Sequence, residues 1–567
     1  MELEPLEERI APAGSVAAEV IGGFLVITGD AADNVISIDQ LGLGAGQFRI
    51  WGNDGTTVGG ASSMEFSGVS KGIRLFMGGG SDGAGLDHIA VSGSVTFDGG
   101  DGDNTLEASG CSIGGKLAVT NGAGFQSTYV SGSVRGNLSI TNGDGGSGVS
   151  VGASVGGNLV VKNGAGGDEL VVTAPVGGSV SVTNGMGDVM AAFASAIGGN
   201  LTMKTLDGAQ AVSLSGADVG KVTISHGSGD SDVLVAHSLI GGTLSLTNAV
   251  GEHTILMDEG TSVLGAVKVI NGDGGSATQF ENVTIGRGGS IVNGAGLDWV
   301  DFHAVASGGG WSIGNGDGGS QVVMDASVVR RAFAVAAGDG INVVDIDTSE
   351  ISGGVKIANG DGDSGTLITE TLLGRTDGPS GPRFASFTLA AGAGLHEVHL
   401  TGAQLANAKI TTEGRTGAGI EDTLIKGTLA VRTGAFDDEI AVKGGAEIAG
   451  AVTIDSGAGN DAIAADDVII GGSVTVKAGD GNDVLLIENY GDHAGPRSTF
   501  AGRFTALMGG DDDMVFVGVD GVAGHAADFA GRVTLDGGLG SDTLDIADLN
   551  TFAFELAYRN FEVVNLP

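Results

Sequence analysis

The sequence contains a single cysteine, Cys111, among its 567 residues. An intramolecular disulfide is therefore excluded, and no set of cysteines exists that would form a metal or redox centre. We interpret Cys111 as a small buried hydrophobic residue, which is the usual role of a free cysteine. Apolar runs of the roughly 18 residues that a membrane-spanning helix needs are also missing, so no transmembrane segment is expected.

Basic residues are scarce as well. Lys and Arg number 26 against 68 Asp and Glu, which gives a net charge of -42 at pH 7. Binding to nucleic acid requires a basic surface that displaces counterions from the phosphates, so nucleic acid is excluded as a partner. An anionic membrane surface is disfavoured for the same electrostatic reason.

Aromatic residues make up only 5% of the chain, and no stretch combines a helical period with helix caps. In contrast, 109 residues are glycine and 41% are hydrophobic, so the chain is too apolar for a disordered acidic tail and is expected to fold. A single core rarely grows beyond about 250–300 residues. The length therefore requires either several domains or a fold that grows by repetition.

A repeat is present. Asn followed by Gly recurs every 21 residues, and the Asn continues along the chain with a drift to 22 or 23, at Asn121, Asn142, Asn163, Asn184, Asn248, Asn271, Asn293, Asn315 and Asn359. A second signal, an aliphatic residue followed by Gly-Gly, keeps the same spacing, as at Val155, Val176 and Ile197. Each repeat is thus predicted to contain two turns and two short strands.

The residues between these turns alternate apolar and polar, which is typical of strands with one buried face. Pairs such as Leu138/Ile140 and Leu159/Val161 share the inward parity. One repeat cannot bury its apolar face alone, whereas stacked repeats bury a continuous core. The sequence predicts an all-β fold, a parallel β-helix or β-solenoid with about 21–22 residues per coil, forming a single elongated rod with end caps. The recurring Asn side chains are expected to form a hydrogen-bonded column.

Regularity varies along the chain and suggests four segments. Residues 1–15 read as an export-like or disordered segment, 16–365 as regular solenoid, 366–432 as less regular coils, and 433–567 as solenoid with a C-terminal cap. Inserted loops are predicted at 374–383, at 488–503 with Tyr490, His493 and Arg497, and at 518–530. Aromatic residues concentrated near the C-terminus, among them Phe552, Phe554 and Tyr558, are expected to close the core.

Several turns follow the pattern G-G-x-G-x-D-x-(apolar)-x, which resembles the haemolysin-type (RTX) calcium-binding repeats. Residues 537–545 fit fully, and other matches end at Asp461, Asp483, Asp438 and Asp513. The resemblance implies Ca²⁺ bound between stacked glycine turns by carboxylates and carbonyls. The candidate metal ligands are Asp438, Asp461, Asp483, Asp513 and Asp542.

The match to these repeats is divergent, because one such turn occurs per coil of 21 or 22 residues whereas the family has two in an 18-residue coil. Many turns in the middle of the chain also lack the acidic residue. Asp168 and Asp298 have no acidic neighbours one coil away, so we interpret them as exposed turn residues.

A second resemblance lies at the N-terminus. Residues 3–13, Leu-Glu-Pro-Leu-Glu-Glu-Arg-Ile-Ala-Pro-Ala, are similar to the LEPR-XLL segment that opens many large bacterial surface proteins. An ordinary secretory signal is not expected, because this segment lacks a basic region followed by an apolar one. The resemblance implies a secreted or cell-surface protein of the bacterial envelope.

We expect a structural or adhesive protein and no enzyme. Its partners would be cell-envelope or extracellular-matrix components, including polysaccharide, and self-association is left open. The alternative is a polysaccharide-binding or polysaccharide-degrading β-helix, a lyase or hydrolase, which would need carboxylates and aromatic platforms gathered in one groove. The nearest grouping, Asp298, Trp299, Asp301 and His303, does not form a convergent set. An ice-binding surface is disfavoured because lysines interrupt the outward threonine column.

Overall fold

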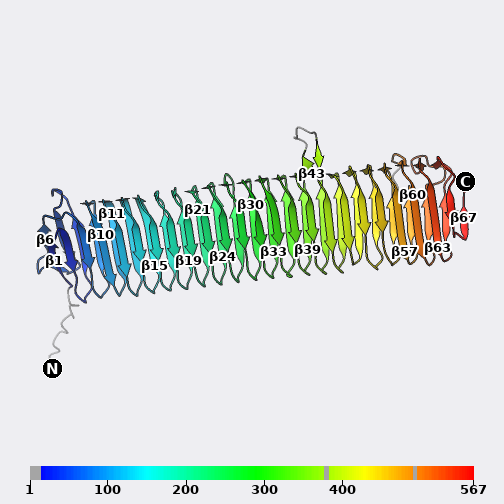
Figure 1. Ribbon diagram of the computed structural model, residues 1–567. Helices are drawn as coiled ribbons and strands as arrows, with labels where there is room; N and C mark the ends of the chain where they lie inside the picture. Colours follow the sequence, from blue (N-terminus) through cyan, green and yellow to red (C-terminus); the bar gives the residue numbers. More distant parts are fainter. Residues whose placement is uncertain (1–13, 376–381, 490–494) are drawn as a thin grey trace, which may run out of the picture. The chain divides into compact units, whose positions relative to one another are not determined.

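The computed structural model describes residues 14–375, 382–489 and 495–567. In these residues the chain forms strands, turns and bends and no helix. The chain divides into two compact units, Met1–Lys268 and Val269–Pro567. Both are β-solenoids of parallel strands (Figure 1). Together they comprise about 22 turns, and each turn has about 22 residues. The predicted fold class is therefore confirmed.

Coils of the first unit such as residues 138–155 contain two strands, as predicted, whereas the coils from Leu201 to Phe552 contain three, one more than the sequence predicts. In the first unit, a representative three-stranded coil consists of β20 (Leu201–Lys204), β21 (Gln210–Ser215) and β22 (Asp218–Val219), and β23 (Val222–Ser225) begins the next coil. The third strand has only two residues, one exposed and one buried. Alternation over two residues cannot be recognised in a sequence, so the repeat pattern does not indicate this strand.

A single backbone conformation makes the corner between the second and third strands. Non-glycine residues with positive φ recur there every 22 residues in the second unit, at Asn282, Ala304, Ala326, Thr348 and Glu370, with φ between 44° and 52°. In the first unit Gly216 takes this position with a φ of 67°. Because L-residues adopt the left-handed region at a cost, the corner is imposed by the packing of the coils.

The core is the inside of each coil. Side chains with the predicted inward parity, such as Leu138, Ile140, Leu159 and Val161, are 0% exposed, and they alternate with exposed or half-buried neighbours. Strand registers place each residue on its equivalent 21 or 22 residues later, as for Leu138 and Leu159. In the second unit Phe500, Phe529 and Phe552 stack on one another with centroids 4.9 and 5.0 Å apart.

The first unit opens with antiparallel strands that the repeat does not reveal. β1 (Ser15–Ile21) pairs with β2 (Phe24–Thr28), and β3 (Val35–Asp39), β4 (Phe48–Asn53) and β6 (Ser63–Phe66) form an antiparallel meander. Parallel pairing starts where β2 meets β7 (Gly72–Phe76) and β3 meets β8 (Gly83–Asp87). These hairpins cover the first strand edges of the solenoid. Of the predicted segment 1–15, residues 1–13 lie outside the described residues.

The predicted asparagine column is confirmed in two runs of coils, whereas Asn359 makes no side-chain hydrogen bond to any described residue. In the first unit, the Nδ2 atoms of Asn121, Asn142 and Asn163 each donate to Oδ1 of the Asn one coil later, at 2.9 Å. In the second unit, Asn271, Asn293 and Asn315 are joined in the same way at 2.9 Å.

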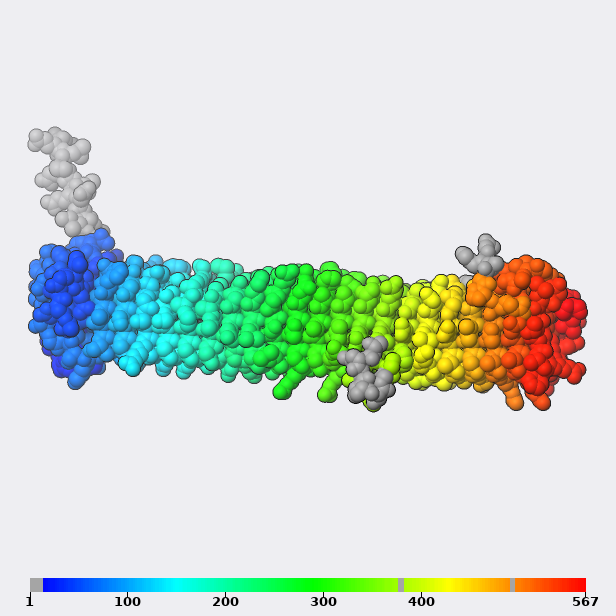
Figure 2. Space-filling view, turned by 90° about the horizontal axis from the view of Figure 1, so that it is seen from above, coloured from blue at the N-terminus to red at the C-terminus, as the bar shows by residue number. Residues whose placement is uncertain are grey.

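The second unit carries the predicted metal ligands, and its coils lie against one another in sequence order (Figure 2). The first strands of the coils around these ligands pair with one another and form the first face of the solenoid. They are β51 (Leu429–Arg432), β54 (Val452–Asp455), β57 (Val474–Asp480), β60 (Phe504–Gly510) and β63 (Val533–Leu539). The second face consists of β46 (His396–Thr401), β49 (Thr416–Glu421), β52 (Glu439–Lys443), β55 (Ala462–Ala465), β58 (Val484–Ile487), β61 (Met514–Val517) and β64 (Thr543–Ile546). The short third strands are β53 (Glu447–Ile448), β56 (Ile469–Ile470), β59 (Ser498–Phe500), β62 (Ala527–Phe529) and β65 (Thr551–Phe552).

Insertions interrupt these coils. The predicted loop 374–383 belongs to an antiparallel hairpin of β43 (Leu372–Arg375) and β44 (Arg383–Phe384), while 376–381 lie outside the described residues. Tyr490 and His493 of the second loop also lie outside them. Arg497 of that loop binds the carboxylate of Asp528 at 2.6 Å. In the last coil Phe554 and Tyr558 are 50% and 43% exposed, so of the aromatics named for the cap only Phe552 joins the core stack.

Candidate metal centre

The five predicted aspartates form one column. Each is the last residue of a turn, directly before or at the start of a second-face strand, and each is at most 3% exposed. The Oδ1 atom of each accepts the backbone N–H of the aspartate one coil earlier. The N–O distances are 2.9 Å for Asp438 to Asp461 and 2.8 Å for Asp461 to Asp483, Asp483 to Asp513 and Asp513 to Asp542. Thr416 N–H binds Asp438 in the same way at 2.6 Å.

The other carboxylate oxygen of these residues has no hydrogen-bond donor. Oδ2 of Asp438, Asp461, Asp483, Asp513 and Asp542 is buried and accepts no hydrogen bond. A buried polar atom without a partner costs free energy of roughly 1–3 kcal/mol, and more when it is charged. An added proton or cation in this column would therefore stabilise the fold.

Two other coils hold Asn at the position that the aspartates occupy. The Nδ2 atom of Asn104 donates to the carbonyls of Gly100 and Gly102, four and two residues earlier, at 3.0 and 3.1 Å. In the second unit Asn342 does the same to Gly338 and Gly340, both at 2.8 Å. The glycine turn thus aims two carbonyl oxygens at a positively polarised group.

The aspartates place an oxygen where those asparagines place a nitrogen. A Cβ atom added to Gly99 would lie 2.9 Å from Nδ2 of Asn104, and one added to Gly537 would lie 2.7 Å from Oδ2 of Asp542. Both glycines stand five residues before the column residue. The carboxylate oxygen consequently faces turn carbonyls, an arrangement that requires a proton or a cation between them.

The pKa values of the column aspartates are raised, because their charged form is unfavourable in this buried place. Burial raises the pKa of Asp438 to about 6 and the pKa values of Asp483 and Asp513 to about 7. Burial also raises the pKa values of Asp461 and Asp542. The backbone N–H that each Oδ1 accepts acts in the opposite direction and does not offset the burial.

The column also defines how a cation would be bound. In the described part of the chain, three potential side-chain ligands lie within 4.8 Å of one another only at Asp466, Glu488 and His525. A cation in the aspartate column would therefore be shared by two stacked aspartates, and turn carbonyls would complete its shell. The Asp466, Glu488 and His525 group was missed by the sequence analysis, because its spacing matches no ligand motif and His525 comes from an inserted loop.

Exposed aspartates that directly precede the column residues account for part of the chain's negative charge. Asn460 N–H donates to Oδ1 of Asp437 at 2.7 Å, and Ser541 N–H donates to Oδ1 of Asp512 at 2.8 Å. Turns in the first unit use the same contact, as between Ala209 N–H and Asp188 at 2.9 Å. These carboxylates bind turn amides that face away from the strands, so much of the charge of this chain is structural.

One interpretation from the sequence is wrong. Asp168 and Asp298 are 7% and 4% exposed and belong to the same column, where each accepts a hydrogen bond of 2.7 Å from a serine hydroxyl one coil earlier. Burial raises the pKa of Asp298 to about 6. The side chain at this position points under the turn rather than outward, which a turn pattern alone does not indicate.

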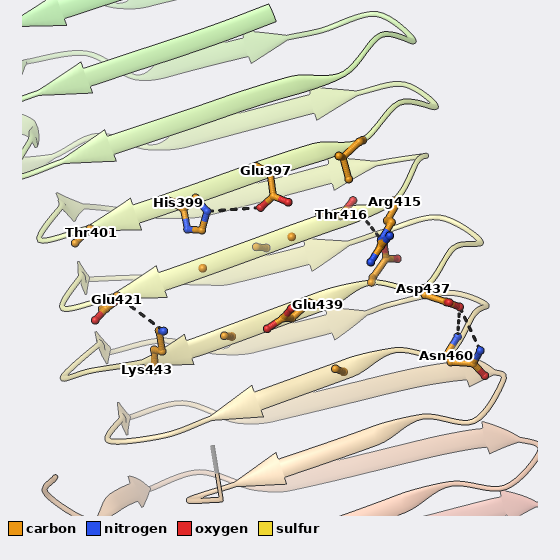
Figure 3. A pocket seen from close by; sticks show the side chains of 17 residues that line it. Glu397, His399, Thr401, Arg415, Thr416, Glu421, Asp437, Glu439, Lys443 and Asn460 are labelled. Atoms are coloured by element: carbon orange, nitrogen blue, oxygen red, sulfur yellow. Dashed lines mark hydrogen bonds and ion pairs between the residues drawn. The ribbon is translucent and has the colours of Figure 1, made fainter. Parts of the chain in front are cut away.

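A groove crosses the outward face of β46, β49 and β52 (Figure 3). Its volume is about 560 Å³, and it exists because Gly417 and Gly419 leave room for Glu397 and His399 of the preceding coil. His399 lies 3.6 Å from the Glu397 carboxylate, whereas His396 is fully buried, so the two histidines point to opposite faces of the strand. The described lining residues include no Phe, Tyr or Trp.

Comparison of the chain with protein-family models, with curated proteins and with solved structures gives no match. The described residues contain no helix of the length and apolarity that crossing a membrane requires.

Proposed function

We propose that this chain is a structural or adhesive β-solenoid that works outside the cytoplasm, and that Ca²⁺ bound along the aspartate column stabilises its C-terminal coils. The observation that carries the proposal is the set of five buried Oδ2 atoms that face glycine turns without a donor. A cation would satisfy these oxygens and the turn carbonyls together.

Calcium fits this column better than other common cations do. It prefers about six to eight oxygen ligands in flexible geometry, and the column offers carboxylates and backbone carbonyls. Magnesium demands a stricter octahedral shell and keeps its water, which a buried column does not supply. Protein modules that bind calcium with dissociation constants of about 10⁻⁴–10⁻³ M act outside cells. The resemblance of residues 3–13 to the LEPR-XLL segment also supports a location outside the cytoplasm.

A structural role agrees with the distribution of polar groups. Buried carboxylates accept backbone N–H groups of the preceding coil, and buried amides bind the amide one coil later. This is a pattern for holding a stack together rather than for acting on one substrate. Its partners would be components of the cell envelope or extracellular matrix.

Thermal melting tests the calcium proposal directly. The melting temperature of the full chain at pH 7.5 is expected to fall in chelator and to recover in millimolar calcium, with bound calcium counted by elemental analysis. Equal melting temperatures in chelator and calcium, with no bound calcium, would remove the metal from this account.

Among the described residues, the groove of Figure 3 gathers charged side chains but no Phe, Tyr or Trp platform, and its charges support a second candidate, binding of polysaccharide. Its lining alternates acidic and basic side chains, including Glu421 and Lys443 at 3.9 Å. Incubation with a panel of acidic polysaccharides would show retention on the chain, and release of reducing ends or unsaturated products would indicate degradation. Glu397→Gln and His399→Ala should weaken either result, and no binding of any polysaccharide would dismiss this candidate.

A further inference from the structure

A second polar cluster lies at another corner of the same coils. Asp466 follows β55, Glu488 follows β58 one coil later, and His525 precedes β62. One ligand atom from each lies within 4.8 Å of the other two, and the three side chains are 5%, 0% and 8% exposed.

Two atoms of this cluster are buried without a partner. Glu488 accepts the backbone N–H groups of Ser498 and Asp467 through Oε1, while its Oε2 accepts no hydrogen bond. Nδ1 of His525 is also buried and unpartnered. The nearby Arg497 does not neutralise Glu488, because its guanidinium binds the Asp528 carboxylate and the Leu549 carbonyl.

The cluster is separate from the aspartate column. Asp461 precedes the four-residue strand β55 and Asp466 follows it. Five residues of extended chain span roughly 17 Å, so the two groups cannot share one ion.

We infer that Asp466, Glu488 and His525 form a buried binding site for a divalent transition-metal ion, of which Zn²⁺ is the probe of choice. Two carboxylates balance the charge of a dication, and the neutral imidazole supplies a nitrogen ligand. A nitrogen ligand selects zinc and related metals, whereas calcium is bound through oxygen. Three protein ligands leave at least one position for water.

The test uses the full chain, stripped of metal and then kept in millimolar calcium so that the aspartate column is supplied. Zinc chloride is added, excess is removed by dialysis, and bound zinc is counted by elemental analysis. We expect one zinc per chain, and loss of that zinc in Glu488→Gln and in His525→Ala. The matched control is His253→Ala, which removes another buried imidazole with an unpartnered Nδ1 outside any such cluster and should retain the zinc.

A second measurement covers the case in which a variant fails to fold. Titration of the unaltered chain with Co²⁺ should give a visible absorption band of nitrogen and oxygen coordination, and zinc should abolish it. The inference is overturned if the unaltered chain binds no zinc in calcium, if folded variants bind as much zinc as the control, or if a tenfold excess of calcium displaces the zinc. An unchanged melting temperature with calcium would count against the aspartate column only, so the two proposals fail independently.

Discussion

At the scale of single residues, the chemistry depends on which atom a side chain places beneath the glycine turn. Asn104 and Asn342 place an amide nitrogen there and bind two carbonyls. Asp483 and its four neighbours place a carboxylate oxygen there and bind none. The change from amide to carboxylate converts a satisfied turn into a place for a proton or a cation.

Replacing Asp483 with Asn should therefore stabilise the chain when calcium is absent. The new amide would donate to the carbonyls of Gly479 and Gly481 as Asn104 does to its own turn, and Oδ1 would still accept the Asp461 N–H. Satisfying this group should raise the free energy of unfolding by about 1–3 kcal/mol in chelator. Chemical denaturation in chelator and in calcium measures the effect.

The control for this variant is Asp480→Asn, which removes the same charge from the exposed last residue of β57 in the same coil. It should change stability little in either condition. A loss of stability in Asp483→Asn without calcium, or an undiminished response to calcium, would contradict the assignment.

The raised pKa values predict an unusual dependence of stability on pH. A carboxyl group with a folded pKa of about 6 to 7 binds its proton more tightly than in the unfolded chain, where the pKa is near 3.8. Its stabilising contribution is complete below pH 4 and is lost as pH rises through the folded pKa. In calcium-free buffer, the melting temperature should thus fall between about pH 4 and pH 7.

Calcium should restore the melting temperature above pH 6. It should have little effect at pH 4.5, because the column aspartates are then protonated. Melting curves across this range with and without calcium provide the check. A melting temperature that rises with pH in calcium-free buffer would show that the buried aspartates are not protonated in the way described.

The residues of the aspartate column were predictable, because a glycine turn ending in Asp is a recognisable pattern. Their burial was not, as Asp168 and Asp298 show, since the direction of a turn side chain depends on backbone angles that the sequence does not display. The hydrogen bond that each aspartate accepts from a backbone N–H of the preceding coil was likewise outside the prediction.

At the scale of elements, each coil is set by two turns and one corner. The asparagine turns were predicted because Asn-Gly marks them and stacking places equivalent amides in a column. The corner was not predicted, because residues as different as Ala304, Thr348 and Glu370 adopt the same positive φ there. The antiparallel strands β1 to β4 and β6 and the position of His525 also lie outside the repeat, so periodicity carries no information about them.

The positive φ of the corner residue should be more favourable for glycine than for alanine. Ala304 has a φ of 52°, so Ala304→Gly should stabilise the second unit by about 1 kcal/mol. The matched change is Gly216→Ala in the first unit, where φ is 67° and an added Cβ would meet nothing within 4 Å. This variant should destabilise by a similar amount, as measured by denaturant unfolding. Effects of the same sign for both variants would contradict the conformational explanation.

At the scale of the whole molecule, stability is a sum of contacts between neighbouring coils. In such a stack, a ligand raises the stability of the coils that hold it and of their neighbours, while distant coils respond little. The column in the first unit is mainly neutral, with Asn104, Gln126, Ser147 and Gln210 at the positions that the five aspartates occupy in the second unit. Any effect of calcium should therefore be local.

Hydrogen exchange followed by mass spectrometry, with the same chain in chelator and in calcium at pH 7.5, measures this locality. Calcium should slow exchange of the backbone amides over residues 433–546 and leave residues 104–215 unchanged. Identical exchange in the two conditions, or slowing of equal size in both regions, would contradict calcium binding by the aspartate column.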